Sequence, residues 1–438
     1  MTLTGGRPPG FARALALVTM ASLVWSVAFT VWTKGGDDEL LDEGDAFYYG
    51  LTAANAGNGN WFQDPFTLAP AADHPPLTVI VLTPASYLFD GALPQRLTMS
   101  VVGALTVAGV GLLGRRVGGP RVGLVAAALA AFNANLWVNH ALVMSEALTA
   151  LFVTLLLWAT YRMAREPTPA AAAAAGALCG LAVLTRAESA LLFVLMIVPV
   201  LARADQLAGR QRLARIGVAG LALAVVMAPW VLWVNSQFDS RVIVSTNEGL
   251  TLAGANCDET YYSENIGFWS IDCSLALLDP QLDASENSAA LRGEAFEYAR
   301  DNLSRLPLVA VAREGRTFGF WRPDLVVAAG EAEGRPAWAS WLGLATFWAL
   351  VPLAVVGARE LHRRHVTVLP FAAVLALTVL ITVLFSGIPR QRLALDIVTC
   401  VLAAVAVAAW RWPSSLDAGV RGIQDRRIQA LRSAQRVA

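Results

Sequence analysis

A short acidic and aromatic segment follows the first long apolar run of this chain. It holds three carboxylates and then three aromatic residues: Asp42, Glu43, Asp45, Phe47, Tyr48 and Tyr49. A carboxylate that is partly desolvated beside aromatic rings has a raised pKa and is a stronger base when ionised. The tyrosines fit either stacking on a sugar or an aromatic belt at a membrane interface. The segment therefore predicts a general base. The alternative is that these acids only reflect membrane topology, as acidic residues just outside a first span.

Two further groups have side chains suited to binding an anion. His74 follows Asp73 and precedes two prolines. It either caps the short helix that the prolines begin or hydrogen-bonds a phosphate. Arg390 and Arg392 stand two residues apart, just before the last apolar run. Because guanidinium groups grip phosphate oxygens bidentately, we expect these two arginines to bind a phosphate.

A third arginine and two acids lie at the ends of other apolar runs. Arg186 stands between two runs with almost no loop, and Glu188 follows it. Glu146 opens another run, where the helix dipole favours an acid. Arg186 either joins the phosphate site or pairs with Glu188 or Glu146. Glu146 is correspondingly either a helix cap or a buried partner of an arginine.

A base, cationic phosphate ligands and aromatic residues together suit the transfer of a sugar from a lipid-linked phosphate donor. The arginines neutralise the phosphate leaving group, and the carboxylate deprotonates an acceptor hydroxyl for in-line attack at the anomeric carbon. One such displacement inverts the anomeric centre. The sequence has no Walker loop, no GxGxxG and no Cys/His spacing typical of a metal site.

The composition identifies the elements that must hold these residues. Of 438 residues, 56% are hydrophobic and only 15% are charged, whereas a soluble domain carries about a quarter charged residues. The mean hydropathy is +0.53. These values predict an all-α polytopic membrane protein. The formal net charge of zero gives no basic field for nucleic acid.

A helix needs about 20 apolar residues to cross a bilayer. By this rule we expect about ten spans, near residues 13–33, 96–114, 120–138, 142–161, 170–186, 188–202, 215–234, 339–358, 366–385 and 393–410. The first run is longer than a signal peptide's core, so it predicts an uncleaved anchor. Residues 77–89 are apolar but short and contain Pro84, which predicts an interfacial or re-entrant helix.

Arginine-rich loops alternate with polar segments that carry few arginines. The positive-inside rule makes the arginine-rich side cytoplasmic, with both chain termini on that side. The other face then holds a first outer loop, residues 34–95, and an extracytoplasmic insert, residues 235–338. We therefore divide the chain into a catalytic transmembrane module (1–234), the insert, C-terminal helices (339–410) and a basic cytoplasmic tail (411–438).

The insert has two features of a small folded unit. Residues 285–300 show helical spacing, with Ser285 as the expected cap. Cys257 and Cys273 both lie in this polar segment, and a disulfide is expected if it faces an oxidising compartment. Cys179 and Cys400 lie in apolar runs and are expected to be packing residues.

Five short motifs, in order, resemble those of the GT-C superfamily of integral-membrane glycosyltransferases. They are similar to the family 39 type, which includes protein O-mannosyltransferases and aminoarabinose transferases. The motifs are residues 44–49 (GDAFYY), 74–77 (HPPL), 145–148 (SEAL), 184–188 (LTRAE) and 390–392 (RQR). The resemblance implies a GT-C-like bundle and places Asp45 at the position of the catalytic aspartate.

One departure from the family pattern affects metal use. Ala46 stands where many members have a second acid, so a divalent metal, already variable in the superfamily, becomes doubtful. Asp64 and Asp73 are the candidate substitutes. No other cofactor is expected.

We therefore expect an inverting glycosyltransferase of the cytoplasmic membrane. Its expected donor is a sugar on a polyprenyl phosphate, and its acceptor is a glycan, a lipid or a protein at the outer face. Asp45 is the expected base, and the expected phosphate ligands are His74, Arg186, Arg390 and Arg392. The supporting residues are Asp42, Glu43, Tyr48, Tyr49, Asp73, Glu146 and Glu188. The alternatives are a polymerase or ligase of lipid-linked glycans and a transporter or flippase, although transporters place ionisable groups near the bilayer midplane.

Overall fold

The computed structural model describes residues 10–36, 44–64, 66–414 and 416–420. Asp42 and Glu43 of the acidic segment lie outside these residues. The described residues form helices and connecting loops without a β-strand, apart from one isolated bridge between Gln63 and Pro70. The expected all-α class is confirmed.

Six of the described helices are long and apolar enough to cross a membrane. They are α1 (Phe11–Lys34), α4 (Leu93–Gly118), α7 (Ser145–Arg165), α10 (Gly209–Val234), α17 (Ala337–Arg363) and the run Pro389–Arg411, made of η3 (Pro389–Arg392) and α19 (Leu393–Arg411). Shorter apolar helices lie between them: α3 (Leu77–Leu88), α5 (Pro120–Phe132), α8 (Pro169–Val183), α18 (Leu369–Leu384) and the run Ala187–Ala202. The chain is therefore a multi-pass membrane protein, with a helix at each of the ten expected spans.

Two of the expected spans are broken rather than continuous. Residues 120–138 form α5 and the separate helix α6 (Ala134–Asn139). Between them Asn133 has an extended backbone, and its side chain accepts a hydrogen bond from the Leu136 N–H. An asparagine that caps a new helix start competes with continuation of the old one. Residues 187–202 likewise consist of a 3-10 turn, η1 (Ala187–Ala190), a π-helical turn, η2 (Phe193–Ile197), and α9 (Val198–Ala202).

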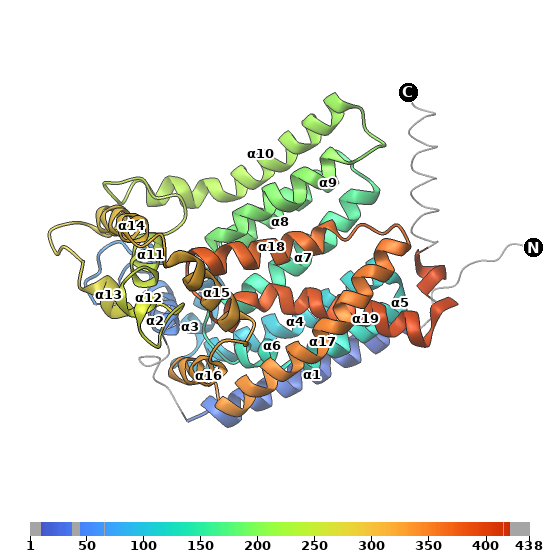
Figure 1. The fold of residues 1–438 in the computed structure, drawn as a ribbon, viewed down its shortest axis with the longest axis horizontal. Coiled ribbons are helices and arrows are strands. Elements are labelled where there is room, and N and C mark those ends of the chain that lie inside the picture. The colour runs from blue at the N-terminus through green and yellow to red at the C-terminus, as the bar shows by residue number, and fades with distance from the viewer. Residues whose placement is uncertain (1–9, 37–43, 65, 415, 421–438) are drawn as a thin grey trace, which may run out of the picture.

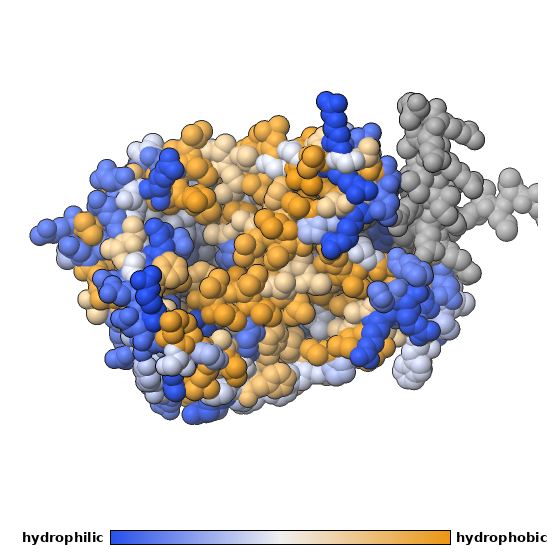
Figure 2. Space-filling view, turned by 45° about the horizontal axis from the view of Figure 1, so that its top comes forward, coloured by the Kyte–Doolittle hydropathy of each residue, from blue (hydrophilic) through white to orange (hydrophobic). Residues whose placement is uncertain are grey.

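The long helices lie side by side along the longest axis of the molecule (Figure 1). On the face seen in Figure 2, apolar side chains cover the middle of this bundle, and hydrophilic side chains gather at both ends. This is the surface expected of a bundle whose middle faces lipid.

The helices of residues 34–95 and of the insert gather at one end of the bundle (Figure 1). They comprise α2 (Asp45–Gly57), α3 and the helices of the insert, α11 (Glu248–Ala255), α12 (Asp258–Tyr262), α13 (Ile271–Leu275), α14 (Ala284–Asp301), α15 (Leu306–Thr317) and α16 (Pro323–Ala332). Within the insert a disulfide joins Cys257 to Cys273. The cap of α14 is Asp283, not Ser285, because the Asp283 carboxylate accepts from the N–H groups of Ser285 and Glu286.

The insert is bound tightly to the end of α18. The guanidinium of Arg313 on α15 donates to the carbonyls of Val383 and Leu384, at 2.6 and 3.4 Å. The N–H of Gly387 donates to the carbonyl of Gly267 at 2.8 Å. A Cβ on Gly387 would lie 2.1 Å from the Arg313 carbonyl oxygen, so only glycine fits here. The insert therefore fixes the turn that leads from α18 into η3.

Candidate active site

Asp45 is the first residue of α2, at the start of the polar end. Gly44 precedes it with φ +60°, a conformation that glycine adopts without a steric penalty. The Asp45 side chain is one-third exposed. Its Oδ2 accepts from Nη1 of Arg390 at 2.8 Å, and its Oδ1 lies 3.7 Å from Nε2 of His74. The structure thus brings the expected base, histidine and arginine together.

Two tyrosines of α2 position His74. The Tyr49 ring stacks on the imidazole with centroids 4.9 Å apart, and the Tyr48 ring meets it edge-on at 5.0 Å. Tyr49 is fully buried. Neither sequence-based interpretation of the tyrosines, sugar stacking or an interfacial belt, therefore describes Tyr49, which instead orients the histidine beside Asp45.

Arg390 lies at the centre of the site and contacts carboxylates from three different elements. Besides Asp45 on α2, its Nη1 lies 3.3 Å from Oε1 of Glu146 on α7. Its Nη2 lies 3.4 Å from Oε1 of Glu333, which follows α16. The arginine is 16% exposed. It is therefore the group through which the segments of the site are connected.

Glu146 lies in the first turn of α7 and is only 2% exposed. Its Oε1 also accepts from Nη1 of Arg186 at 3.0 Å, and Nε of Arg186 contacts Glu188 at 2.5 Å. The first turn gives the carboxylate a favourable dipole, and two arginines neutralise it. Glu146 makes no capping hydrogen bond, so it is the buried partner of an arginine rather than a helix cap. Arg186 pairs with both Glu146 and Glu188.

Arg392 does not join this cluster. Its side chain is fully buried, its Nε lies 3.4 Å from Oδ1 of Asp396, and its Nη1 donates to the Thr317 carbonyl. The Phe347 ring lies 4.0 Å from the guanidinium carbon. The sequence did not separate Arg390 from Arg392. The structure places only Arg390 beside Asp45, because Asp396, one helical turn further along, holds Arg392 inside the bundle.

Neither candidate for a second acid beside Asp45 contacts it. Asp64 accepts hydrogen bonds from Thr67 and the Phe66 N–H within its own loop. Asp73 is half-buried, and burial raises its pKa although the charge of His74 opposes this. The acids that share Arg390 with Asp45 are instead Glu146 and Glu333.

Glu333 and Arg335 were missed by the sequence analysis. They lie at the end of the insert, in the linker between α16 and α17. Oε2 of Glu333 pairs with Nη1 of Arg335, whose Nη2 donates to Oδ1 of Asn139 at 3.0 Å. Their only sequence signal is a cluster of charges just before a span, which is ordinarily a solvated loop.

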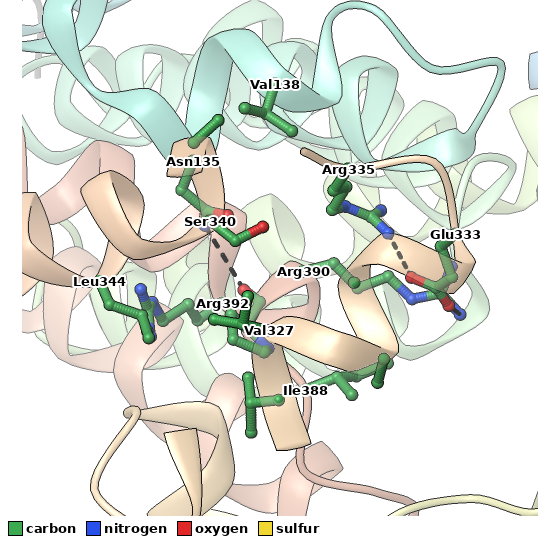
Figure 3. A pocket seen from close by; sticks show the side chains of 15 residues that line it. Asn135, Val138, Val327, Glu333, Arg335, Ser340, Leu344, Ile388, Arg390 and Arg392 are labelled. Carbon is green, nitrogen blue, oxygen red and sulfur yellow. Dashed lines mark hydrogen bonds and ion pairs between the residues drawn. The ribbon is translucent and has the colours of Figure 1, made fainter. Parts of the chain in front are cut away.

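A cavity of about 60 Å³ adjoins Arg390 (Figure 3). Its wall combines aliphatic side chains from α6, α16 and α17 with three arginines, Arg335, Arg390 and Arg392. Each of these arginines has one buried guanidinium N–H group without a hydrogen-bond partner among the described residues. Unsatisfied buried donors are costly, so the cavity has the chemistry of an anion site beside an apolar wall.

The electrostatics of Asp45 correct one expectation. Burial would raise its pKa, as the sequence analysis assumed. The charges of Arg390 and then His74, together with the Arg390 hydrogen bond, outweigh burial and hold the pKa of Asp45 below its ordinary value. Asp45 is therefore ionised at neutral pH but is a weak base while Arg390 stays paired to it.

Among the described residues, one group of three acids could hold a metal ion by the closeness of its oxygens. It consists of Asp239, Asp283 and Glu286 in the insert, where Asp283 and Glu286 form the cap of α14. Asp45, Glu146 and Glu333 do not form such a group. That a divalent metal is doubtful at Asp45 stays a prediction.

Comparisons with known proteins agree with this architecture. Residues 73–233 match the sequence profile of the family described as dolichyl-phosphate-mannose-protein mannosyltransferase. The matched region contains His74, Glu146 and Arg186, whereas Asp45 and Arg390 lie outside it. No curated protein sequence matches the chain.

The fold is similar to that of the archaeal oligosaccharyltransferase AglB from Archaeoglobus fulgidus, solved with an inhibitory peptide and a dolichol-phosphate. The TM-score is 0.51 at 16% identity, over 95% of this chain and 56% of AglB, so the chain spans about half the length of that enzyme. A weaker similarity, with TM-score 0.43 at 17% identity, relates 92% of this chain to 78% of ArnT from Cupriavidus metallidurans bound to undecaprenyl phosphate. The family match covers less than half of the chain, and the similarity to AglB shows a shared fold.

Proposed function

We propose that this protein is an inverting glycosyltransferase that moves a sugar from a polyprenyl-phosphate carrier to an acceptor hydroxyl at the outer face of the cytoplasmic membrane. One observation carries the proposal: the carboxylate of Asp45 and the guanidinium of Arg390 lie 2.8 Å apart beside a cavity that is lined by further arginines and aliphatic side chains. A base and a phosphate ligand thus meet at one point.

The donor's phosphodiester binds at Arg390, with His74 and Arg186 supporting the same anion. The acceptor oxygen attacks the anomeric carbon, and the bond from that carbon to the phosphate oxygen breaks. The acceptor proton passes to Asp45, and the polyprenyl phosphate leaves with the bonding electrons. Cationic groups aimed at the departing phosphate stabilise the charge that develops there.

Donor binding also removes the weakness of Asp45 as a base. In the empty site Arg390 lowers the pKa of this carboxyl. A phosphate that shares the charge of Arg390 weakens its effect on Asp45, so the pKa rises toward the value that burial favours. Asp45 thereby becomes a better proton acceptor when a donor is present.

The remaining residues support this site in the proposal. Tyr48 and Tyr49 orient His74, and Glu146 and Glu188 hold Arg186. Arg392 lines the cavity, and its proposed role is to fix the junction of η3 and α19 beneath Arg390. The first module contributes Asp45, His74 and Arg186, and the C-terminal helices contribute Arg390.

The central experiment is Asp45→Asn in the full-length protein. We expect normal folding and retained binding of a polyprenyl phosphate, with transfer lost, since an amide cannot accept the acceptor proton. Asp90→Asn, an exposed acid in the same outer loop, is the matched control and should transfer normally. Turnover by Asp45→Asn at the wild-type rate would contradict the assignment of Asp45 as the general base.

A further inference from the structure

Glu333 bridges two arginines of the cavity wall. Its Oε1 lies 3.4 Å from Nη2 of Arg390, and its Oε2 pairs with Nη1 of Arg335 (Figure 3). One carboxylate whose two oxygens each contact a different guanidinium has the arrangement of a phosphate group held between two arginines. The carboxylate of Glu333 thus occupies the position between Arg390 and Arg335.

Three carboxylates share Arg390, although Arg186 and Arg335 also pair with two of them. Asp45, Glu146 and Glu333 all lie within 3.4 Å of its guanidinium nitrogens. A fourth anion at the same guanidinium would be repelled by three like charges at close range. A phosphate therefore binds Arg390 more tightly when one of these carboxylates moves away.

The three carboxylates differ in how firmly they are held. Glu146 is 2% exposed and shared with Arg186, and Asp45 is the proposed base at the start of α2. Asp45 lies in a helix and hydrogen-bonds Arg390 at 2.8 Å, whereas Glu333 lies 3.4 Å from Arg390, in a linker, and precedes Gly334, whose φ is +81°. Glu333 is the carboxylate that can leave with the least disturbance.

We propose that Glu333 occupies the phosphate position of the empty donor site, and that the donor phosphate displaces it to bind between Arg390 and Arg335. This inference rests on the proposed function and adds two residues to it. Arg335 becomes a direct phosphate ligand; its side chain is buried, and its Nε has no partner among the described residues. Glu333 becomes a residue that sets donor affinity by competing for the same two arginines.

The test measures binding of a short-chain polyprenyl monophosphate to the full-length protein in detergent. In Glu333→Gln the competing charge is gone, and we expect a Kd lower by about fivefold, the effect of one weak ion pair. In Arg335→Gln a charged ligand is lost, and we expect a Kd higher by about tenfold or more. Glu331→Gln, an exposed acid two residues earlier, is the matched control and should bind as the wild type does.

Kinetics separate competition from a structural role. Competition predicts that Glu333→Gln lowers KM for the donor while kcat stays within about twofold, since the group leaves before the transition state. A parallel loss of kcat and thermal stability in Glu333→Gln, or an unchanged or higher Kd, would overturn the inference while wild-type binding still supports the proposed function. Absence of any binding by the wild type would instead overturn the proposed function and this inference together.

Inorganic phosphate as a second probe identifies the source of the anion. The aliphatic wall formed by Val326, Val327 and Leu344 favours a lipid carrier over a free ion. We expect the polyprenyl phosphate to bind far more tightly than inorganic phosphate at the same pH. Equal affinity would overturn the assignment of the position to a lipid phosphate.

Discussion

Arg390 and Arg392 belong to the same 3-10 turn, yet they lie in opposite environments. Arg390 contacts carboxylates from α2, α7 and the α16–α17 linker and is 16% exposed. Arg392 has one carboxylate partner, Asp396, one turn away on its own helix, and is fully buried under Phe347. An arginine whose partners come from separate elements can exchange them for a ligand. An arginine with a local, buried partner stabilises the folded structure.

The largest expected effect concerns the buried arginine. Arg392→Gln leaves Asp396 as an uncompensated buried charge, and we expect a loss of about 3–5 kcal/mol in the free energy of unfolding. The measurement is thermal or denaturant unfolding in detergent. The paired change Arg392→Met with Asp396→Leu removes both charges and should recover most of that stability. An Arg392→Gln protein of normal stability that fails to bind polyprenyl phosphate would contradict the comparison and favour a ligand role for Arg392.

The next effect concerns the exchangeable arginine. Arg390→Gln removes the proposed main ligand of the leaving phosphate, and we expect kcat/KM for transfer to fall by about 10²–10³-fold. Its loss of stability should be much smaller than that of Arg392→Gln, since Arg186 still neutralises Glu146. A transfer assay and an unfolding curve on the same preparation check both parts. Retained transfer in Arg390→Gln would remove the central phosphate ligand from the proposal.

A smaller effect is a shift in the pH dependence of transfer. Burial raises the pKa of Asp45, but Arg390 and His74 outweigh it and the net shift is downward. The ionised carboxylate is the active form, so the rate falls as the pH drops through this pKa. Without Arg390, burial acts with less opposition, and the acid limb of the residual kcat/KM profile should move to higher pH in Arg390→Gln. An acid limb that stays in place would show that Arg390 does not set the charge state of Asp45.

The smallest effect concerns the ring over Arg392. Phe347→Leu removes a cation–π contact and should lower the free energy of unfolding by about 1–2 kcal/mol. The Kd for polyprenyl phosphate should stay unchanged, because Phe347 contacts the structural arginine and does not line the cavity. A change in Kd without a change in stability would show that the two arginines are coupled through the turn.

The sequence predicted the class, the spans and several of the residues that meet at Asp45. Asp45, His74, Arg186 and Glu146 could be identified because each stands in a short motif at the end of an apolar run. The break between α5 and α6 could not, because the apolar content is continuous and only the capping preference of Asn133 interrupts it.

The different positions of Arg390 and Arg392 could not be predicted from the sequence either. Two residues of one short turn carry no sign of which side chain faces the site and which faces the interior. The answer depends on Asp396, Thr317 and Phe347, which only tertiary packing brings together. Glu333 and Arg335 were missed for a related reason, since charges before a span are normally solvated.

The long separation of Asp45 and Arg390 has a consequence for biosynthesis. The ion pair joins residues that are 345 positions apart, and η3 directly precedes the final apolar helix. Contacts of such long range form late, because the intervening chain must first be made and inserted. The hydrogen bond from Gly387 to Gly267 likewise joins the turn before η3 to the insert, which precedes it in the chain. A nascent chain thus contains Asp45 long before Arg390 is made, so this ion pair cannot form until the insert and α18 have been synthesised.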